Sequence, residues 1–103
     1  MAVFDVPASA GKKKENRFAF RLNGKVHTIP KLGFISGDAS VFARDNQDTM
    51  TLPMVYRELI AIERPEIRED LFKLADDQVV LLADAWVLES GVSAGESEAS
   101  EDS

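Results

Sequence analysis

The clearest hydrophobic pattern lies near the start of the chain, where apolar and polar residues alternate on both sides of an Asn-Gly pair. The residues are Phe18-Ala19-Phe20-Arg21-Leu22, then Asn23-Gly24, then Lys25-Val26-His27-Thr28-Ile29. Asn-Gly readily adopts the positive φ angles of a two-residue type I′ turn. The pattern therefore predicts a β-hairpin over residues 18–29, and Pro30 is expected to end its second strand.

The hairpin register predicts which side chains need cover. Phe18 faces Ile29, Phe20 faces His27, and Arg21 faces Val26. One face then carries Phe18, Phe20, Leu22, His27 and Ile29. An isolated two-stranded hairpin is only marginally stable in water, so we expect helices from the rest of the chain to pack on this face.

After Pro30 the spacing of apolar residues changes from two to about 3.6, which is typical of helices. A first helix is predicted at about 38–45, with Ser36 or Asp38 as its N-cap. A second is predicted at 52–63, capped by Thr51, with Pro53 tolerated in its first turn.

Two further helices are predicted toward the end of the chain. One, at 66–74, follows Pro65 and gathers its acidic residues near its N-terminus, as the helix dipole favours. The last, at 77–89, is predicted to be capped by Asp76 and stopped by Gly91. The expected fold class is mainly α with an N-terminal β-hairpin (α+β), with about four short helices packed in one small domain.

The two ends of the chain differ in composition from residues 17–89, which form the predicted folded domain. Residues 1–16 contain few large apolar side chains and the run Lys12-Lys13-Lys14, so a flexible basic arm is expected there. Residues 90–103 are mostly small or acidic, which does not offset the entropy of ordering. A disordered acidic tail is therefore predicted over 90–103.

Composition narrows the classes of function. The 103 residues suffice for one modest core, and 45% apolar with 29% charged residues is typical of a globular domain. The chain contains no cysteine, which excludes disulfides, thiolate metal sites and cysteine nucleophiles. A formal charge of −6 argues against nucleic acid as a partner, and no aromatic residues interleave with Lys12–14 to stack bases. No stretch approaches the roughly 20 apolar residues of a membrane helix.

Candidate chemistry is sparse. His27 is the one histidine, and no nucleophile lies near it in the sequence. The acids Glu66, Glu69 and Asp70, and the pair Asp76-Asp77, suit helix starts better than a metal site. The glycines form no phosphate-binding loop. We therefore expect no catalytic site, no cofactor and no metal.

Two wide apolar stripes, at residues 52–62 and 79–87, leave two interpretations open. Periodicity reports burial without saying what does the burying, so the simpler interpretation is that both stripes build the core. The alternative is that one face binds a partner helix. On the second interpretation the candidate partner-binding residues are Leu52, Val55, Tyr56, Leu59 and Trp86.

The end of the chain resembles a known family. The run that carries the resemblance is Ala85-Trp86-Val87-Leu88-Glu89-Ser90-Gly91-Val92-Ser93-Ala94-Gly95-Glu96-Ser97-Glu98-Ala99-Ser100. It is similar to the end of the tail assembly chaperones of long-tailed (siphovirus) phages and prophages of actinobacteria, in which a larger apolar residue is more frequent at the position of Ala94. The order of hairpin, helices and tail over residues 17–100 also resembles that family.

The resemblance implies a non-enzymatic protein of the host cytoplasm, absent from the mature virion. It would bind the tape measure protein and keep it soluble while tail tube subunits polymerise. A frameshifted longer form would recruit the tail tube protein, and self-association along the client is a further expectation. The competing classes are a small structural virion component, such as a head–tail connector or tail completion protein, and a regulatory nucleic-acid-binding protein.

Overall fold

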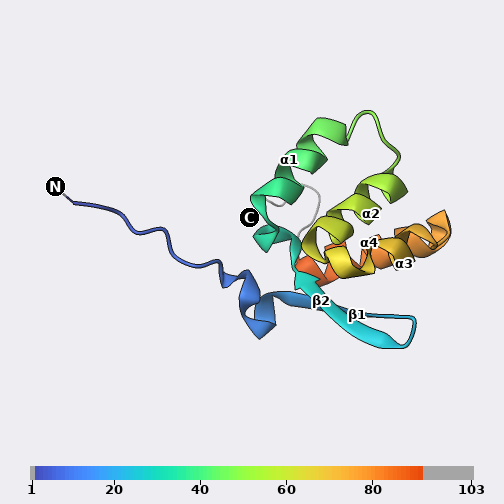
Figure 1. Ribbon diagram of the computed structural model, residues 1–103, viewed down its shortest axis with the longest axis horizontal. Coiled ribbons are helices and arrows are strands. Elements are labelled where there is room, and N and C mark those ends of the chain that lie inside the picture. Colours follow the sequence, from blue (N-terminus) through green and yellow to red (C-terminus); the bar gives the residue numbers. More distant parts are fainter. Residues whose placement is uncertain (1, 92–103) are drawn as a thin grey trace.

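A computed structural model describes residues 2–91 of the chain (Figure 1). The hairpin consists of β1 (Arg17–Leu22) and β2 (Lys25–Pro30), and the α-helices are α1 (Gly37–Asn46), α2 (Leu52–Glu63), α3 (Arg68–Phe72) and α4 (Asp76–Ser90). Short 3₁₀ turns are η1 (Ala10–Lys12), η2 (Lys14–Asn16), η3 (Leu32–Phe34) and η4 (Pro65–Ile67). This arrangement confirms the predicted fold class: a two-stranded hairpin followed by four helices within the described residues.

The hairpin forms in the predicted register. Phe18 pairs with Ile29, Phe20 with His27 and Arg21 with Val26. Asn23 and Gly24 at the turn have φ angles of 51° and 79°, which are the positive values that a type I′ turn requires. On the predicted covered face, the side chains of Phe18, Phe20, Leu22 and Ile29 are buried, and His27 is half-buried with its ring 5.8 Å from that of Phe20.

Helices α2 and α4 cover the hairpin. Both helices contact it, and α2 also packs against α1, α3 and α4 (Figure 1). Trp86 of α4 is fully buried, and its Nε1 donates a hydrogen bond to the carbonyl oxygen of Pro30 at 3.0 Å. One helical turn later, the Ser90 hydroxyl accepts a hydrogen bond from the amide of Leu32 at 2.9 Å. These two contacts fix α4 to the end of β2 and the start of η3.

One buried charge organises the packing of α2 against α3 and α4. Arg57 lies on the inner side of α2 and is the one buried charged residue among those described. Its guanidinium donates to the carbonyl oxygens of Leu71 and Leu74, the latter at 2.6 Å, and contacts the Asp76 carboxylate at 2.9 Å. These acceptors lie at the end of α3 and the start of α4, so Arg57 satisfies backbone groups that a helix end leaves unpaired.

The helix starts correct some of the predicted caps. For α1, Ser36 rather than Asp38 is the N-cap, and its hydroxyl accepts from the Ala39 amide at 3.2 Å. Thr51 precedes α2 as predicted, but its side chain makes no capping hydrogen bond. Asp76 is the first residue of α4 rather than its cap, because its carboxylate is directed to Arg57. Ala75 takes the cap position, and its amide donates to Gln78 Oε1 at 2.8 Å.

The predicted helix at 66–74 is divided into two pieces. Residues Pro65–Ile67 form the 3₁₀ turn η4, and α3 covers only Arg68–Phe72. Ile67 has φ −105° and ψ 10°, outside the α region, while its side chain is buried in the core. The backbone at Ile67 thus interrupts the regular helix that the sequence pattern indicates.

The boundaries of the folded part also differ from the prediction at both ends. Residues 10–16, expected in the flexible arm, form η1 and η2, where Ser9 Oγ accepts from the Gly11 amide and Asn16 Nδ2 donates to the Ala10 carbonyl. Gly11 is buried against Phe34, and a Cβ at Gly11 would lie 3.0 Å from the Phe34 Cβ. Ser90, expected in the acidic tail, ends α4 instead, and Gly91 stops the helix at φ 68° as predicted. Residues 92–103 of the expected tail lie outside the described residues.

Candidate partner-binding surface

Three of the five predicted partner-binding residues are part of the core. Val55, Leu59 and Trp86 are all buried, and they are therefore not accessible to a partner in this structure. They lie on the inner sides of α2 and α4 and form part of the core. This is the arrangement expected from the simpler interpretation, in which the apolar stripes build the core. The prediction is corrected for these three residues.

The other two predicted residues, Leu52 and Tyr56, lie at the surface. Leu52 is 66% exposed at the start of α2, and Tyr56 is half-buried one turn later. They line a shallow groove between α2 and α4, which we call the α2–α4 groove. Its lining residues are Leu52, Pro53, Tyr56, Val80, Ala83 and Asp84.

The buried Trp86 supports this groove from below. The rings of Tyr56 and Trp86 lie 6.1 Å apart in an edge-to-face arrangement with an interplanar angle of 74°. Aromatic pairs favour this geometry, so the Trp86 ring restricts the position of the Tyr56 ring. Trp86 therefore lies beneath the groove, in contact with Tyr56, and does not itself reach the surface.

The electrostatics of the groove are simple. Burial raises the pKa of the Tyr56 phenol above its ordinary value of 10.0, and the Asp84 carboxylate raises it further. The phenol is therefore neutral at physiological pH, and Asp84 supplies the only formal charge among the lining residues. The α4 sequence continues this character, because it contains Asp76, Asp77, Asp84 and Glu89 and no lysine or arginine.

A second apolar feature lies on the solvent side of α4, beside the groove. Leu81 and Leu88 are 69% and 79% exposed, and their spacing of seven residues places them on one side of the helix. Asp77 and Asp84 are exposed on the same side. We call these four residues the α4 outer stripe.

Sequence reasoning missed Leu81 and Leu88 as candidates. In the last helix, the apolar spacing selected Trp86 as a candidate, and Trp86 is part of the core. A signal was nevertheless present, because the large apolar residues of α4 are not confined to one side: Leu81 and Leu88 lie opposite Val79 and Trp86. Since the described chain covers only one side of α4, the opposite side is available to a partner.

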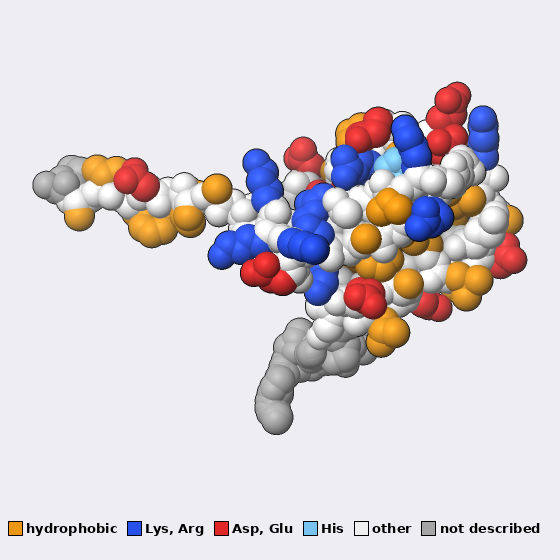
Figure 2. Space-filling model, turned by 90° about the horizontal axis from the view of Figure 1, so that it is seen from below, with side chains coloured by type: hydrophobic (Ala, Val, Ile, Leu, Met, Phe, Trp, Pro, Cys, Tyr) orange, Lys and Arg blue, Asp and Glu red, His pale blue; other side chains and the backbone are white. Residues whose placement is uncertain are grey.

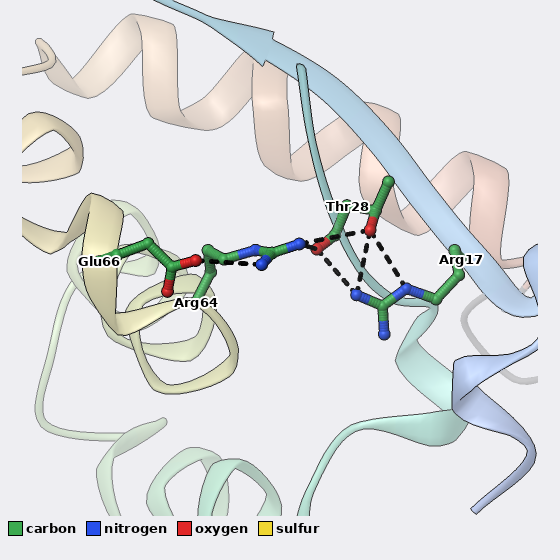
Figure 3. Close-up of polar contacts among 4 residues, drawn as sticks. All are labelled: Arg17, Thr28, Arg64 and Glu66. Atoms are coloured by element: carbon green, nitrogen blue, oxygen red, sulfur yellow. Dashed lines mark hydrogen bonds and ion pairs between the residues drawn. The ribbon is translucent and has the colours of Figure 1, made fainter. Parts of the chain in front are cut away.

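A cluster of arginines at the hairpin base is structural rather than chemical. Figure 3 shows Arg17 and Arg64 approaching Thr28 from opposite sides, and both donate to its carbonyl oxygen, at 2.9 and 2.7 Å. Arg64 also pairs with Glu66 at 3.0 Å, and the pKa of Glu66 is lowered by a hydrogen bond from its own backbone amide and by Arg64. The guanidinium groups thus use their donors to join β2 to η4.

The remaining chemical candidates are dispersed. His27 lies beside Phe20 on the hairpin. Over residues 2–91, no three acidic or histidine side chains converge as a metal site would require. In the same part of the chain, no helix has the length and apolar character needed to cross a membrane.

Comparisons with known proteins leave the surface as the main guide to function. No family model matches the chain, and no match is found among curated proteins or among solved structures. The groove and the outer stripe of α4 are therefore interpreted from their own residues.

Proposed function

We propose that this chain is a tail assembly chaperone of a long-tailed phage or prophage, which binds the tape measure protein in the host cytoplasm and keeps it soluble. The observation that supports this proposal is the α4 outer stripe, where large apolar side chains are exposed beside carboxylates. The resemblance of residues 85–100 to that family supplies the identity of the client.

The outer stripe suits a helical client. Leu81 and Leu88 are separated by about 10.5 Å along the helix axis, which is close to two helical turns. An apolar helix presents anchor residues at similar intervals, at i, i+3, i+4 and i+7. A client helix lying along α4 would therefore bury both leucines and part of its own apolar side in one contact.

The charge of the chain suits a solubilising role. Asp77 and Asp84 flank the exposed leucines, and the whole chain carries a formal charge of −6. A client covered by copies of an acidic protein acquires net charge, which opposes aggregation. Recruitment of the tail tube protein by a frameshifted longer form is part of the proposal and rests on the resemblance alone.

Three residues in the run that carries the resemblance have structural roles here. Trp86 and Ser90 hold α4 against Pro30 and Leu32, and Gly91 ends the helix in the left-handed conformation. Residues 85–90 of the run belong to α4, the helix that also carries Leu81 and Leu88. The run is thus connected to the surface that we propose for the client.

Co-expression with the tape measure protein of the same genome tests the proposal. We expect the client to be soluble with the wild-type chain and insoluble with the double variant Leu81→Asp/Leu88→Asp, because two charges in the contact oppose burial of the client. The double variant Val26→Asp/Val41→Asp is the matched control, since both valines are exposed on other elements. A client whose solubility does not depend on the chain, or does not depend on the leucines, would contradict the proposal.

Purified phage particles provide a second test. The chaperone proposal expects the chain to be absent from them. Its presence in a fixed ratio to the tail proteins would instead identify a structural virion component, such as a head–tail connector or tail completion protein.

A further inference from the structure

Positive charge is concentrated at one end of this acidic chain. Residues 12–31 contain seven lysines and arginines and one acidic residue, whereas residues 32–91 contain five basic and twelve acidic residues. Figure 2 shows basic side chains gathered where the N-terminal segment joins the domain. The residues at the base of the hairpin, which we call the basic surface, are Lys12, Lys13, Lys14, Arg17 and Lys31. The three consecutive lysines are all exposed.

The basic surface has no ion-pair partner among the described residues. The four ion pairs within residues 2–91 all use arginines between positions 44 and 68. Arg17 donates to backbone carbonyl oxygens, which carry no formal charge. Glu63 lines a shallow depression together with Lys12 and Arg17, but its carboxylate accepts a hydrogen bond from the Ser36 amide at 2.8 Å. The three lysines are therefore available to an acidic group from outside residues 2–91.

Residues 92–103 have the complementary charge. They contain Glu96, Glu98, Glu101 and Asp102 and no lysine or arginine. An acidic segment is attracted to a surface with an excess of positive charge. A nucleic acid would instead also meet the net negative charge of the rest of the chain, which repels phosphate groups. Charge therefore favours an acidic protein segment as the occupant of the basic surface.

The end of α4 lies beside the basic surface. The Ser90 hydroxyl accepts from the Leu32 amide at 2.9 Å, and the adjoining Lys31 amide donates to the carbonyl oxygen of Asn16 at 2.9 Å. Figure 1 accordingly shows the red end of α4 at the base of the hairpin, where the blue turns η1 and η2 join it. The described chain thus ends next to the surface that lacks an acidic partner.

The length of chain after α4 suffices for contact within one molecule. Glu96 can lie at most roughly 18 Å from Gly91, and Asp102 at most roughly 40 Å, if the intervening residues are extended. A segment joined to a surface by so short a connection has an effective concentration in the millimolar range. Acidic residues of the same chain therefore have an advantage over those of another molecule.

We propose that the acidic residues 96–102 bind the basic surface of the same molecule. The contact is electrostatic, and it joins the chain after α4 to the base of the hairpin. Exposed ion pairs are individually weak and are screened by salt, so the segment exchanges between bound and released states and is released at high ionic strength. The inference rests on charge and position, and it does not depend on the proposed function.

Amide NMR spectra of the full chain test this inference. The variant Glu96→Gln/Glu98→Gln/Glu101→Gln/Asp102→Asn, which we call the neutral variant, removes the four charges and keeps the sizes of the side chains. At low salt we expect the amide signals of residues 12–17 to differ between the wild type and the neutral variant. In about 1 M NaCl, where the screening length is about 3 Å, these differences should shrink by at least about fivefold.

A matched control removes four negative charges from other parts of the surface. The variant Asp48→Asn/Glu69→Gln/Asp77→Asn/Asp84→Asn changes only exposed residues, and it should leave the amide signals of residues 12–17 as they are in the wild type. The reciprocal variant Lys12→Gln/Lys13→Gln/Lys14→Gln, also at exposed positions, should shift the amide signals of residues 96–102.

Three results would overturn the inference. The first is that residues 12–17 have the same signals in the wild type and the neutral variant, or respond equally to the control variant. The second is that the differences grow with protein concentration, which would assign the contact to separate copies. The third is that a single-stranded DNA oligonucleotide binds residues 12–17 equally in the wild type and the neutral variant, which would indicate a nucleic-acid surface. Because no client is present, each of these results leaves the chaperone proposal to its own test.

Discussion

The two sides of α4 have similar residues and different surroundings. The inner side carries Val79, Ala83 and Trp86, which are all buried, and Trp86 belongs to the core formed with the hairpin and α2. The outer side carries Leu81 and Leu88, which are exposed. The difference teaches that apolar content alone does not identify the core: the side of the helix that meets the hairpin is buried, and the other side has no cover within the described residues.

The largest expected effect comes from the inner side. Trp86→Ala removes a fully buried ring and its hydrogen bond to Pro30, so we expect the free energy of unfolding to fall by about 3–5 kcal/mol. Leu88→Ala, two residues later on the outer side, should change the free energy of unfolding by less than about 0.5 kcal/mol. Urea denaturation followed by circular dichroism measures both. Equal losses from the two variants would show that the sides of α4 do not differ as described.

Replacing Arg57 should cause the next largest loss of stability, and it should cost more than replacing Asp76, the other member of the ion pair. Arg57→Met leaves the carbonyl groups of Leu71 and Leu74 without their donor, and we expect a loss of about 2–3 kcal/mol. Asp76→Asn alters the same pair at its exposed end, where the side chain is 72% exposed, so the loss should stay below about 1 kcal/mol. The denaturation midpoints of both variants measure the two losses of stability. A larger loss in Asp76→Asn than in Arg57→Met would contradict the prediction.

The smallest expected effect concerns the phenol in the groove. The pKa of Tyr56 is raised in the folded chain, so the unfolded chain releases this proton first as the pH increases. The contribution of Tyr56 to stability is therefore complete below about pH 10 and is lost as the pH rises through the folded pKa. Tyr56→Phe should show a shallower decline of stability above pH 10 than the wild type. If the free energy of unfolding fell equally with pH in the two proteins, burial and Asp84 would not raise the pKa of Tyr56 in the folded chain.

Sequence reasoning reached the hairpin and the helices because local rules decide them. The alternation around Asn23-Gly24 leaves a single register that covers the apolar residues, and this register is observed. The four helical segments followed from their apolar spacing and from residues such as Ser36 and Gly91 that mark helix ends. These signals act over a few residues and do not depend on the rest of the fold.

The parts that were missed depend on contacts between distant segments. Arg57 looks like a solvent-exposed residue in sequence, and its burial becomes apparent only when the ends of α3 and α4 are placed beside it. Asp76 resembles a cap, but the same arginine draws its carboxylate away. Within residues 10–16, Gly11 lies against Phe34 of η3, and its carbonyl oxygen accepts a hydrogen bond from Arg17 of β1.

The candidate surface could be predicted only in part for the same reason. Spacing identified Leu52 and Tyr56, but it did not separate them from Val55, Leu59 and Trp86, because all five belong to apolar stripes. Which residues of a stripe stay exposed is decided by the packing angle between helices. That angle is set by the hairpin and by neighbouring helices rather than by the stripe itself.

The central claim is that the outer side of α4 is a client-binding surface, and methyl NMR tests it most directly. Leucine methyl signals would be followed while a helical fragment of the tape measure protein is added to the full chain. We predict that the signals of Leu81 and Leu88 shift in proportion to the amount bound, while those of the buried Leu71 stay in place. Binding of the fragment with unchanged Leu81 and Leu88 signals would contradict the claim.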